Sequence, residues 1–157
     1  MALAAALSGF RCQRNLLLLS RNLAGTVTRG LTRMVDAKLD AVETVRIDEG
    51  RFKYILIKVY GKEQADGTEP SKLIVRGFQR SPYHSDIYDE VSGSLQPLGL
   101  DSECLGGGKI EHRPDLKHIR IFSYSQGFGK ADHHEAKKLL LTKYPNYKIE
   151  VSESDEY

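Results

Sequence analysis

A histidine near the start of a predicted helix is the strongest candidate for chemistry in this sequence of 157 residues. Ser81 and Pro82 predict the helix start, because Ser is a favoured N-cap and Pro fits the first helical position. His84 would then be the third helical residue, beside amides that lack intrahelical partners and bind anions. The helix dipole disfavours an imidazolium there, so we expect a neutral His84 that can accept a proton. A partly exposed histidine without a role is the alternative.

Two glycine-containing segments could also approach a phosphate. The run Gly106-Gly107-Gly108 is followed by Lys109 and then Ile110, whereas a P-loop needs Ser or Thr after the lysine. A tight turn with positive φ is therefore the favoured interpretation of this run. The loop at residues 125–131 offers backbone amides and a hydroxyl to an anion, although a plain connection between a strand and a helix would look the same.

The remaining histidines do not predict a metal site. His133 and His134 are adjacent, whereas the zincin motif needs histidines four residues apart with Glu beside the first. Polarity at a helix start accounts better for this pair. His112 and His118 alternate with apolar residues, which predicts a solvent-facing position for both. The chain shows no paired catalytic carboxylates and no Cys-His arrangement, so we expect neither a metal nor a cofactor.

The elements that position these residues follow the order β-β-β-α-β-β-α-β. Hairpins and two helices without strict βαβ alternation predict a single α+β domain with a mixed β-sheet of about six strands flanked by two helices. A linker is expected at residues 35–41. In the first helix, Ile87, Val91, Leu95 and Leu98 recur at helical spacing and predict a buried stripe. Strands are predicted at 42–47, 52–60, 73–76, 109–112, 118–124 and 147–151, and helices from Ser81 to about Leu98 and from Asp132 to Tyr144.

Charge is concentrated at the N-terminus of the chain. Residues 1–34 hold five arginines, several Ser and Thr and no acidic residue, a composition typical of a mitochondrial transit peptide. A secretory signal, a disordered extension and a start at Met34 that gives a cytosolic form are the alternatives. The leucine run at 16–19 is too short to span a bilayer. Cys12 and Cys104 predict neither a disulfide framework nor a zinc knuckle, which favours a reducing compartment.

The chain after the leader, residues 35–157, holds the domain expected at residues 42–152 and carries more acidic than basic residues. Without the five leader arginines, 18 Lys and Arg remain against 21 Asp and Glu, a net charge of −3. Nucleic-acid binding usually needs a basic face, so this class is disfavoured. We expect a cytoplasmic monomer that binds neither nucleic acid nor membrane, with a mitochondrial form if residues 1–34 direct import.

Five segments, in order along the domain, resemble the Janus/phosphohistidine phosphatase family. Three of them, YH-x-DI, C-x-GGG-[KR]-I and YS-x-x-[FY]G, are together specific enough that a chance match to all three is remote. The segments are FKYILIKV (52–59), IVRGF (74–78), YHSDIYD (83–89), ECLGGGKIEH (103–112) and YSQGFGKADH (124–133).

The resemblance implies a metal-independent phosphatase that acts on phosphohistidine in other proteins. The family's catalytic histidine falls on His84 and its substrate-contacting lysine on Lys53. Two positions differ from some members of the family. Where those proteins have Arg, this chain has Lys109, which cannot bind phosphate in the bidentate way that Arg does. Where they have Ala, this chain has Gly127. The other implied substrate-binding residues are Tyr83, Ser85, Ser125, Gln126, Gly127 and Lys109.

In the expected mechanism, backbone amides hold the phosphoryl oxygens and Lys53 neutralises their charge. The amides would come from His84, Ser85 and the loop at 125–127. His84 either takes a proton from the attacking water or attacks phosphorus itself, and the sequence does not decide between these roles. A non-catalytic phosphate-binding regulatory module, related to the Janus proteins of sex differentiation, is the other function class left open.

Overall fold

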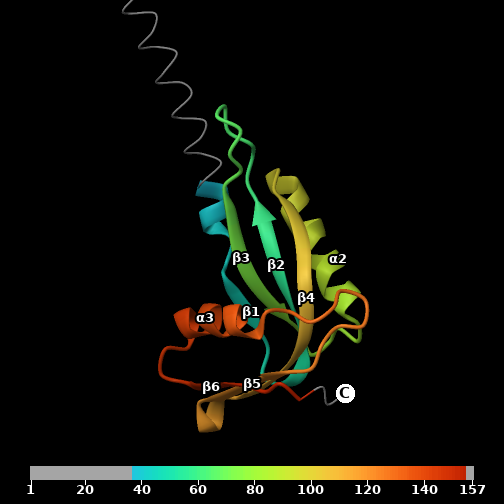
Figure 1. Cartoon of the computed structure of the whole chain (residues 1–157), viewed down its shortest axis with the longest axis vertical. Helices are drawn as coiled ribbons and strands as arrows, with labels where there is room; N and C mark the ends of the chain where they lie inside the picture. The colour runs from blue at the N-terminus through green and yellow to red at the C-terminus, as the bar shows by residue number, and fades with distance from the viewer. Residues whose placement is uncertain (1–36, 155–157) are drawn as a thin grey trace, which may run out of the picture. The chain divides into compact units, whose positions relative to one another are not determined.

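The computed structural model describes residues 37–154, which build one curled sheet with helices on its two faces (Figure 1). The predicted leader at residues 1–34 lies outside the described residues. Residues 37–41, predicted as linker, are instead helical, because Leu39 is buried in the core and anchors them. The elements are β1 (Val45–Ile47), β2 (Gly50–Tyr60), β3 (Ser71–Gly77), α2 (His84–Leu95), the 3-10 helix η1 (Gln96–Leu98), β4 (Asp101–Arg113), the 3-10 helix η2 (Pro114–Leu116), β5 (His118–Phe122), α3 (His133–Lys143) and β6 (Lys148–Val151).

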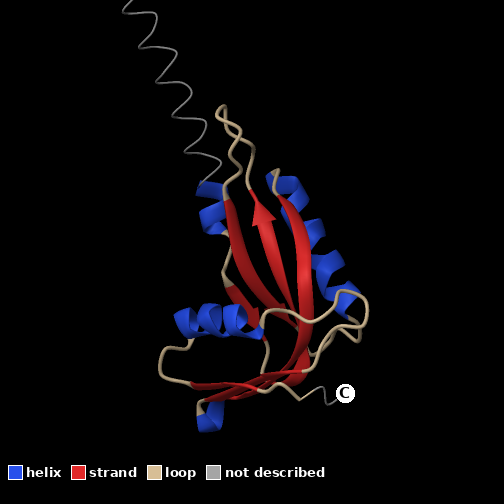
Figure 2. Cartoon of the chain, in the orientation of Figure 1, coloured by secondary structure: helices blue, strands red, loops and turns tan. Residues whose placement is uncertain are grey.

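The sheet is mixed, as predicted. Its strand order is β1-β3-β2-β4-β5-β6, with β1/β3 and β5/β6 parallel and the three central pairings antiparallel (Figure 2). The long strands β3, β2 and β4 run side by side, and β5 and β6 cross below them where the sheet curls (Figure 1). The predicted α+β fold and element order are confirmed.

The central strand β2 is buried on both faces. Tyr54 and Leu56 point into a core shared with α3, while Ile55 and Ile57 point into a second core shared with α2. This separation follows from the alternation of side chains along a strand. The run FKYILIKVY is apolar on both sides because a helix covers each face of the sheet.

Helix α2 begins at His84, two residues later than Pro82, the first helical position that the sequence predicted. Tyr83 is its N-cap, and the Asp86 carboxylate accepts a hydrogen bond from the Tyr83 amide at 3.0 Å. This hydrogen bond from the N-cap amide to the third helical residue is half of a capping box and stabilises the helix start. The helix ends at Leu95, so Leu98 lies in η1 and is 43% exposed, contrary to the predicted buried stripe; Ile87, Val91 and Leu95 are buried as expected.

The glycine run forms part of β4 instead of a tight turn. Only Gly106 has a positive φ, at 143°. The pairing shifts there, from Leu56 with Gly106 to Ile57 with Cys104, so that Leu105 is the extra residue of a β-bulge. Strand β4 is therefore much longer than the predicted segment at 109–112, and its glycines face close neighbours across the fold.

His112 is buried, which corrects the predicted solvent-facing position. Its ring lies 5.1 Å from the Tyr144 ring centroid and 5.6 Å from that of Tyr147, and its Nδ1 bonds to the Asp48 carbonyl at 2.8 Å. Because the sheet curls, the C-terminal part of β4, which contains His112, is covered by the end of α3 and the loop that follows it. The alternation of apolar and polar residues along β4 does not predict this burial.

Candidate active site

His84 is the first residue of α2 and lies directly over the glycine run of β4. Its Nε2 is 2.9 Å from the carbonyl oxygen of Gly108, and the side chain is buried. A Cβ at Gly107 would lie only 2.7 Å from His84 Cδ2, so only glycine lets the ring approach the strand this closely. The N–H at Nε2 donates to the carbonyl, which leaves Nδ1 with a lone pair and no hydrogen-bond partner among the described residues.

The surroundings of His84 favour this neutral form. Burial lowers the pKa of the imidazole, and the nearby charges of Lys53 and Lys109 lower it further, while the Gly108 hydrogen bond opposes them. A neutral histidine at pH 7 is suited to accept a proton or to attack as a nucleophile. The physical cause differs from the sequence argument, which relied on the helix dipole alone.

A hollow of about 480 Å³ opens beside His84. Seven of the eight residues predicted for the site line it, and sequence reasoning missed the eighth lining residue, Phe128. Lys109, the remaining predicted residue, lines a neighbouring hollow instead. The residues around His84 come from β2, the start of α2 and the loop after β5: Lys53, Tyr83, His84, Ser85, Ser125, Gln126, Gly127 and Phe128.

The loop after β5 presents fewer amides than the sequence argument assumed. Ser125 and Gly129 exchange two backbone hydrogen bonds, of 3.2 and 2.9 Å, and the Ser125 hydroxyl accepts from the Phe128 amide at 3.2 Å. The Ser125 amide is therefore occupied. Among the hydrogen bonds of the described residues, none is donated by the amides of Gln126 and Gly127, which leaves these two for an anion.

The start of α2 offers further donors. The amides of His84 and Ser85 are in the first turn, where no intrahelical acceptor exists, and both residues line the hollow. The positive end of the helix dipole favours an anion at the same place. Residues from the start of α2 and from the loop after β5, whose amides lack acceptors among the described residues, therefore line the same hollow as the His84 ring.

Lys53 contributes the charge nearest to this space. It extends from β2, and its ammonium donates a hydrogen bond to the Pro82 carbonyl. The nitrogen also lies 5.4 Å from the centroid of the exposed Tyr83 ring. The lysine is thereby held at the rim of the hollow by the residues that lead into α2, where it can neutralise an oxyanion.

A buried pair behind the glycine run was missed by the sequence analysis. The hydroxyl of Tyr54 is 2.5 Å from His133 Nδ1, and His133 Nε2 is 2.9 Å from the Ser123 carbonyl. Both side chains are buried. The interpretation of His133 as a polar residue at a helix start is therefore incomplete, because its side chain is part of the interior. A Cβ on Gly108 would lie 2.8 Å from His133 Cε1, which places this pair against the residue that holds His84. Strand alternation buries Tyr54, but no sequence signal pairs it with His133.

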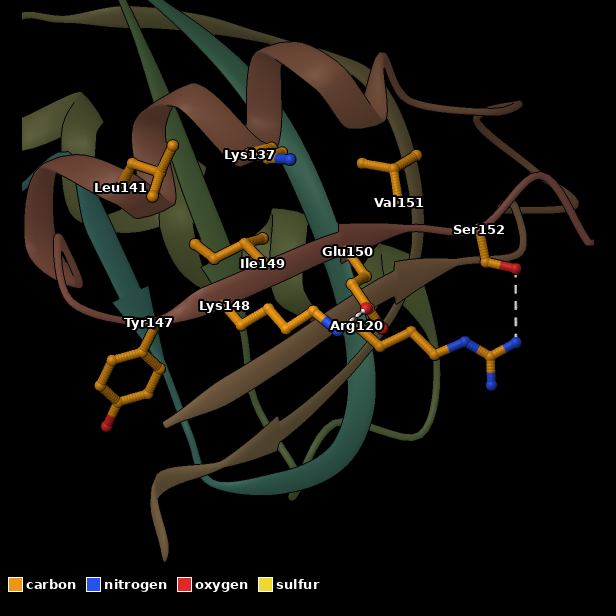
Figure 3. Close-up of a pocket in the computed structure, with 9 residues that line it drawn as sticks. All are labelled: Arg120, Lys137, Leu141, Tyr147, Lys148, Ile149, Glu150, Val151 and Ser152. Carbon is orange, nitrogen blue, oxygen red and sulfur yellow. Dashed lines mark hydrogen bonds and ion pairs between the residues drawn. The ribbon is translucent and has the colours of Figure 1, made fainter. Parts of the chain in front are cut away.

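A larger hollow, of about 790 Å³, lies between α3 and β6 and contains none of the predicted residues (Figure 3). Two of its three basic residues, Arg120 and Lys148, have protein partners. Arg120 donates to the Ser152 hydroxyl at 3.3 Å, and Lys148 pairs with Glu150 at 2.5 Å. Size alone therefore does not identify a site, and the hollow beside His84 is the candidate because of the chemistry of its lining residues.

Residues 37–154 hold neither a metal-binding cluster nor a membrane-spanning helix. No group of three or more His, Cys, Asp or Glu side chains in this range is arranged to hold a metal ion. None of the helices in this part of the chain is long and apolar enough to cross a membrane.

The chain is similar to a family of known proteins over most of its length. The model of the Janus/Ocnus family matches residues 39–148. The sex-regulated protein janus-A of Drosophila pseudoobscura pseudoobscura is 56% identical over 126 residues, which cover 80% of this chain and 85% of that protein. The janus-A of Drosophila melanogaster is 44% identical over 126 residues, covering 80% and 90%. The 14 kDa phosphohistidine phosphatase of Sus scrofa is 44% identical over 116 residues, covering 72% and 91%.

Proposed function

The chain belongs to the Janus/Ocnus family, and from this premise we propose that it is a protein phosphohistidine phosphatase that works without a metal ion. The observation that carries the proposal is the hydrogen bond from His84 Nε2 to Gly108. It fixes the tautomer of the neutral imidazole, with the proton on Nε2 and Nδ1 available. The ring lines a hollow where helix-start amides and Lys53 can receive a phosphoryl group. The 44% identity to a phosphohistidine phosphatase supports the same activity.

The reaction needs mainly positioning and charge stabilisation. Water adds to phosphorus as the P–N bond breaks, and the products are inorganic phosphate and a free histidine side chain in the substrate protein. The amides of Ser85, Gln126 and Gly127 would hold the phosphoryl oxygens, and Lys53 would neutralise their charge. These groups are already in place, so little reorganisation is needed when charge develops.

His84 has two candidate roles in this scheme. As a general base, Nδ1 takes a proton from the attacking water. As a nucleophile, Nδ1 forms its own bond to phosphorus, the substrate histidine leaves, and water then hydrolyses the phosphorylated His84. Rapid acid-free quenching during turnover, followed by mass spectrometry, separates the two: phosphate on His84 with a lifetime that matches turnover identifies the nucleophile, and its absence identifies the base.

A non-catalytic phosphate-binding module is the second candidate. It is favoured by the fact that the two Drosophila relatives, at 56% and 44% identity, carry the name of a sex-regulated protein, not of an enzyme. Such a module would bind phosphohistidine proteins through the same amides and Lys53 without turnover. His84 would then have no reason to keep an available Nδ1.

The deciding experiment is release of inorganic phosphate from a phosphohistidine peptide, measured against the spontaneous rate. The enzyme is expected to turn over repeatedly and to keep its rate in excess EDTA. Stoichiometric binding without release would support the regulatory module. Loss of activity in EDTA with recovery on addition of zinc or magnesium would contradict the metal-independent mechanism.

A further inference from the structure

A second, basic hollow adjoins the candidate active site. Its volume is about 240 Å³, and three of its lining residues, Arg51, Lys53 and Lys109, are cationic. No carboxylate belongs to the described residues that line it. The rest of the lining consists of Phe52, Gln79, Ser81 and Pro82. We refer to this hollow as the basic subsite.

The basic subsite arises from the register of two strands. Arg51 and Lys53 are two residues apart on β2 and therefore share a face of the sheet. Lys53 pairs directly with Lys109 across the β2/β4 ladder. The same face is apolar under α2, where Ile55 and Ile57 are buried. Beyond the start of the helix it carries Arg51, Lys53 and Lys109, with Glu111 opposite Arg51 as the acidic residue of the same register.

Like charges placed directly opposite each other in a sheet are unfavourable. Here the pKa of Lys109 is lowered by burial first and then by the charges of Arg51 and Lys53. The Arg51 guanidinium lies 5.0 Å from the centroid of the Phe122 ring, which holds it above the sheet. An anion bound among the three cations would relieve their repulsion.

The basic subsite and the hollow beside His84 share a wall. Lys53 lines both. Its ammonium bonds to the carbonyl of Pro82, which lines the basic subsite, and approaches the ring of Tyr83, which lines the other hollow. Neighbouring Cα atoms of a bound peptide are about 3.8 Å apart. A side chain one or two residues from a phosphohistidine at His84 can therefore enter the basic subsite.

We propose that the basic subsite binds the carboxylate of an Asp or Glu that lies one or two residues from the phosphohistidine in the substrate protein. This inference rests on the proposed function and specifies its substrate class, proteins in which the phosphohistidine is flanked by acidic residues. Arg51 and Lys109 contact the carboxylate, while the phosphoryl group is held beside His84.

The test compares two phosphohistidine peptides that differ only by Glu or Gln on both sides of the phosphohistidine. At low ionic strength, kcat/KM of the wild type is expected to be about tenfold higher for the Glu peptide, and the preference should shrink as salt screens the charges. Arg51→Gln should lower kcat/KM for the Glu peptide about two- to fivefold, as an exposed ion pair allows. Its activity on the Gln peptide should not change.

Lys62→Gln is the matched control, because it removes one exposed positive charge beyond the other end of β2. It should leave the preference intact. Equal kcat/KM for both peptides in the wild type, or an unchanged preference in Arg51→Gln, would overturn the basic subsite while the phosphatase activity stands. If the wild type hydrolyses neither peptide, the proposed phosphatase function is contradicted, and so is the role of the basic subsite in that reaction.

Discussion

The Nε2 of His84 lies 2.9 Å from the carbonyl oxygen of Gly108, and this single contact sets the chemistry of the candidate site. It selects the tautomer, turns the lone pair of Nδ1 away from the strand and ties the start of α2 to β4. The contact exists because β4 has no side chain at Gly107, where a Cβ would meet the imidazole.

Gly107→Ala should therefore impair the site. The new methyl group would lie 2.7 Å from His84 Cδ2 and 2.8 Å from the Tyr54 carbonyl oxygen, and the latter cannot move without the strand. We expect a loss of about 1–3 kcal/mol in the free energy of unfolding. Displacement of the imidazole should reduce kcat by about 100-fold. Denaturant titration and the phosphate-release assay measure the two effects.

Gly93→Ala is the matched control for this substitution. Gly93 lies within α2, and a Cβ there would meet nothing within 4 Å. Alanine should keep wild-type activity and raise stability by roughly 0.5–1 kcal/mol, because glycine is the poorer helix former. Equal activity of the Gly107 and Gly93 variants would contradict the close approach of His84 to β4.

The pH dependence of kcat/KM should show the lowered pKa of His84. The neutral imidazole is the active form, so activity is lost only as the pH falls through this lowered pKa, below the usual value of about 6.5. Lys109→Gln removes a positive charge that lowers this pKa, and the acidic limb should therefore move to higher pH. A shift to lower pH, or none, would contradict the Coulombic contact between these residues.

Lys53→Ala should weaken the hold on the charged phosphoryl group. We expect kcat/KM to fall by about tenfold, the order of one charge-assisted hydrogen bond. KM should rise, and kcat should fall as well if the contact between Lys53 and the phosphoryl group tightens in the transition state. Lys58→Ala removes the same charge from the far part of β2 and should leave both constants unchanged; steady-state kinetics of the two variants decide this.

Tyr54→Phe tests the buried pair behind the glycine run. The substitution removes the hydroxyl that lies 2.5 Å from His133 Nδ1 and leaves a buried nitrogen without a partner. Such a loss costs about 1–3 kcal/mol in the free energy of unfolding. Chemical denaturation should show this decrease. Unchanged stability would mean that the contact contributes nothing to holding β2 against α3.

The sequence predicts the fold well because its signals are local. The density of β-branched and aromatic residues in FKYILIKVY is one such signal, and the Asp132 cap, whose carboxylate accepts the His134 and Glu135 amides at 3.0 Å, is another. Each acts within a few residues. The glycine run is different. These glycines are needed because α2 packs across β4 and brings His84 against Gly107. That contact joins residues far apart in the sequence, so no local pattern predicts it.

The candidate site, like the fold, is predicted from the sequence where local signals define it and not where distant contacts do. His84 stands out from its position at a helix start, and the loop at 125–127 offers amides to an anion, while the resemblance to a family supplies Lys53 and the role of the loop. The placement of Lys109 in the neighbouring hollow depends on the register of β2 with β4, and the partner of His133 depends on the curl of the sheet. Both are properties of distant pairings, which a single sequence does not reveal.

The catalytic role of His84 is tested most directly by kcat for phosphate release from a phosphohistidine peptide, measured for the wild type and for His84→Ala. The far-ultraviolet circular dichroism spectrum and the unfolding transition of the variant should show that it folds. With His84 as base or nucleophile, kcat should fall by about two to four orders of magnitude, and phosphate binding should persist through the amides at the start of α2. A folded His84→Ala protein that keeps near wild-type kcat would contradict the central claim that His84 performs the chemistry.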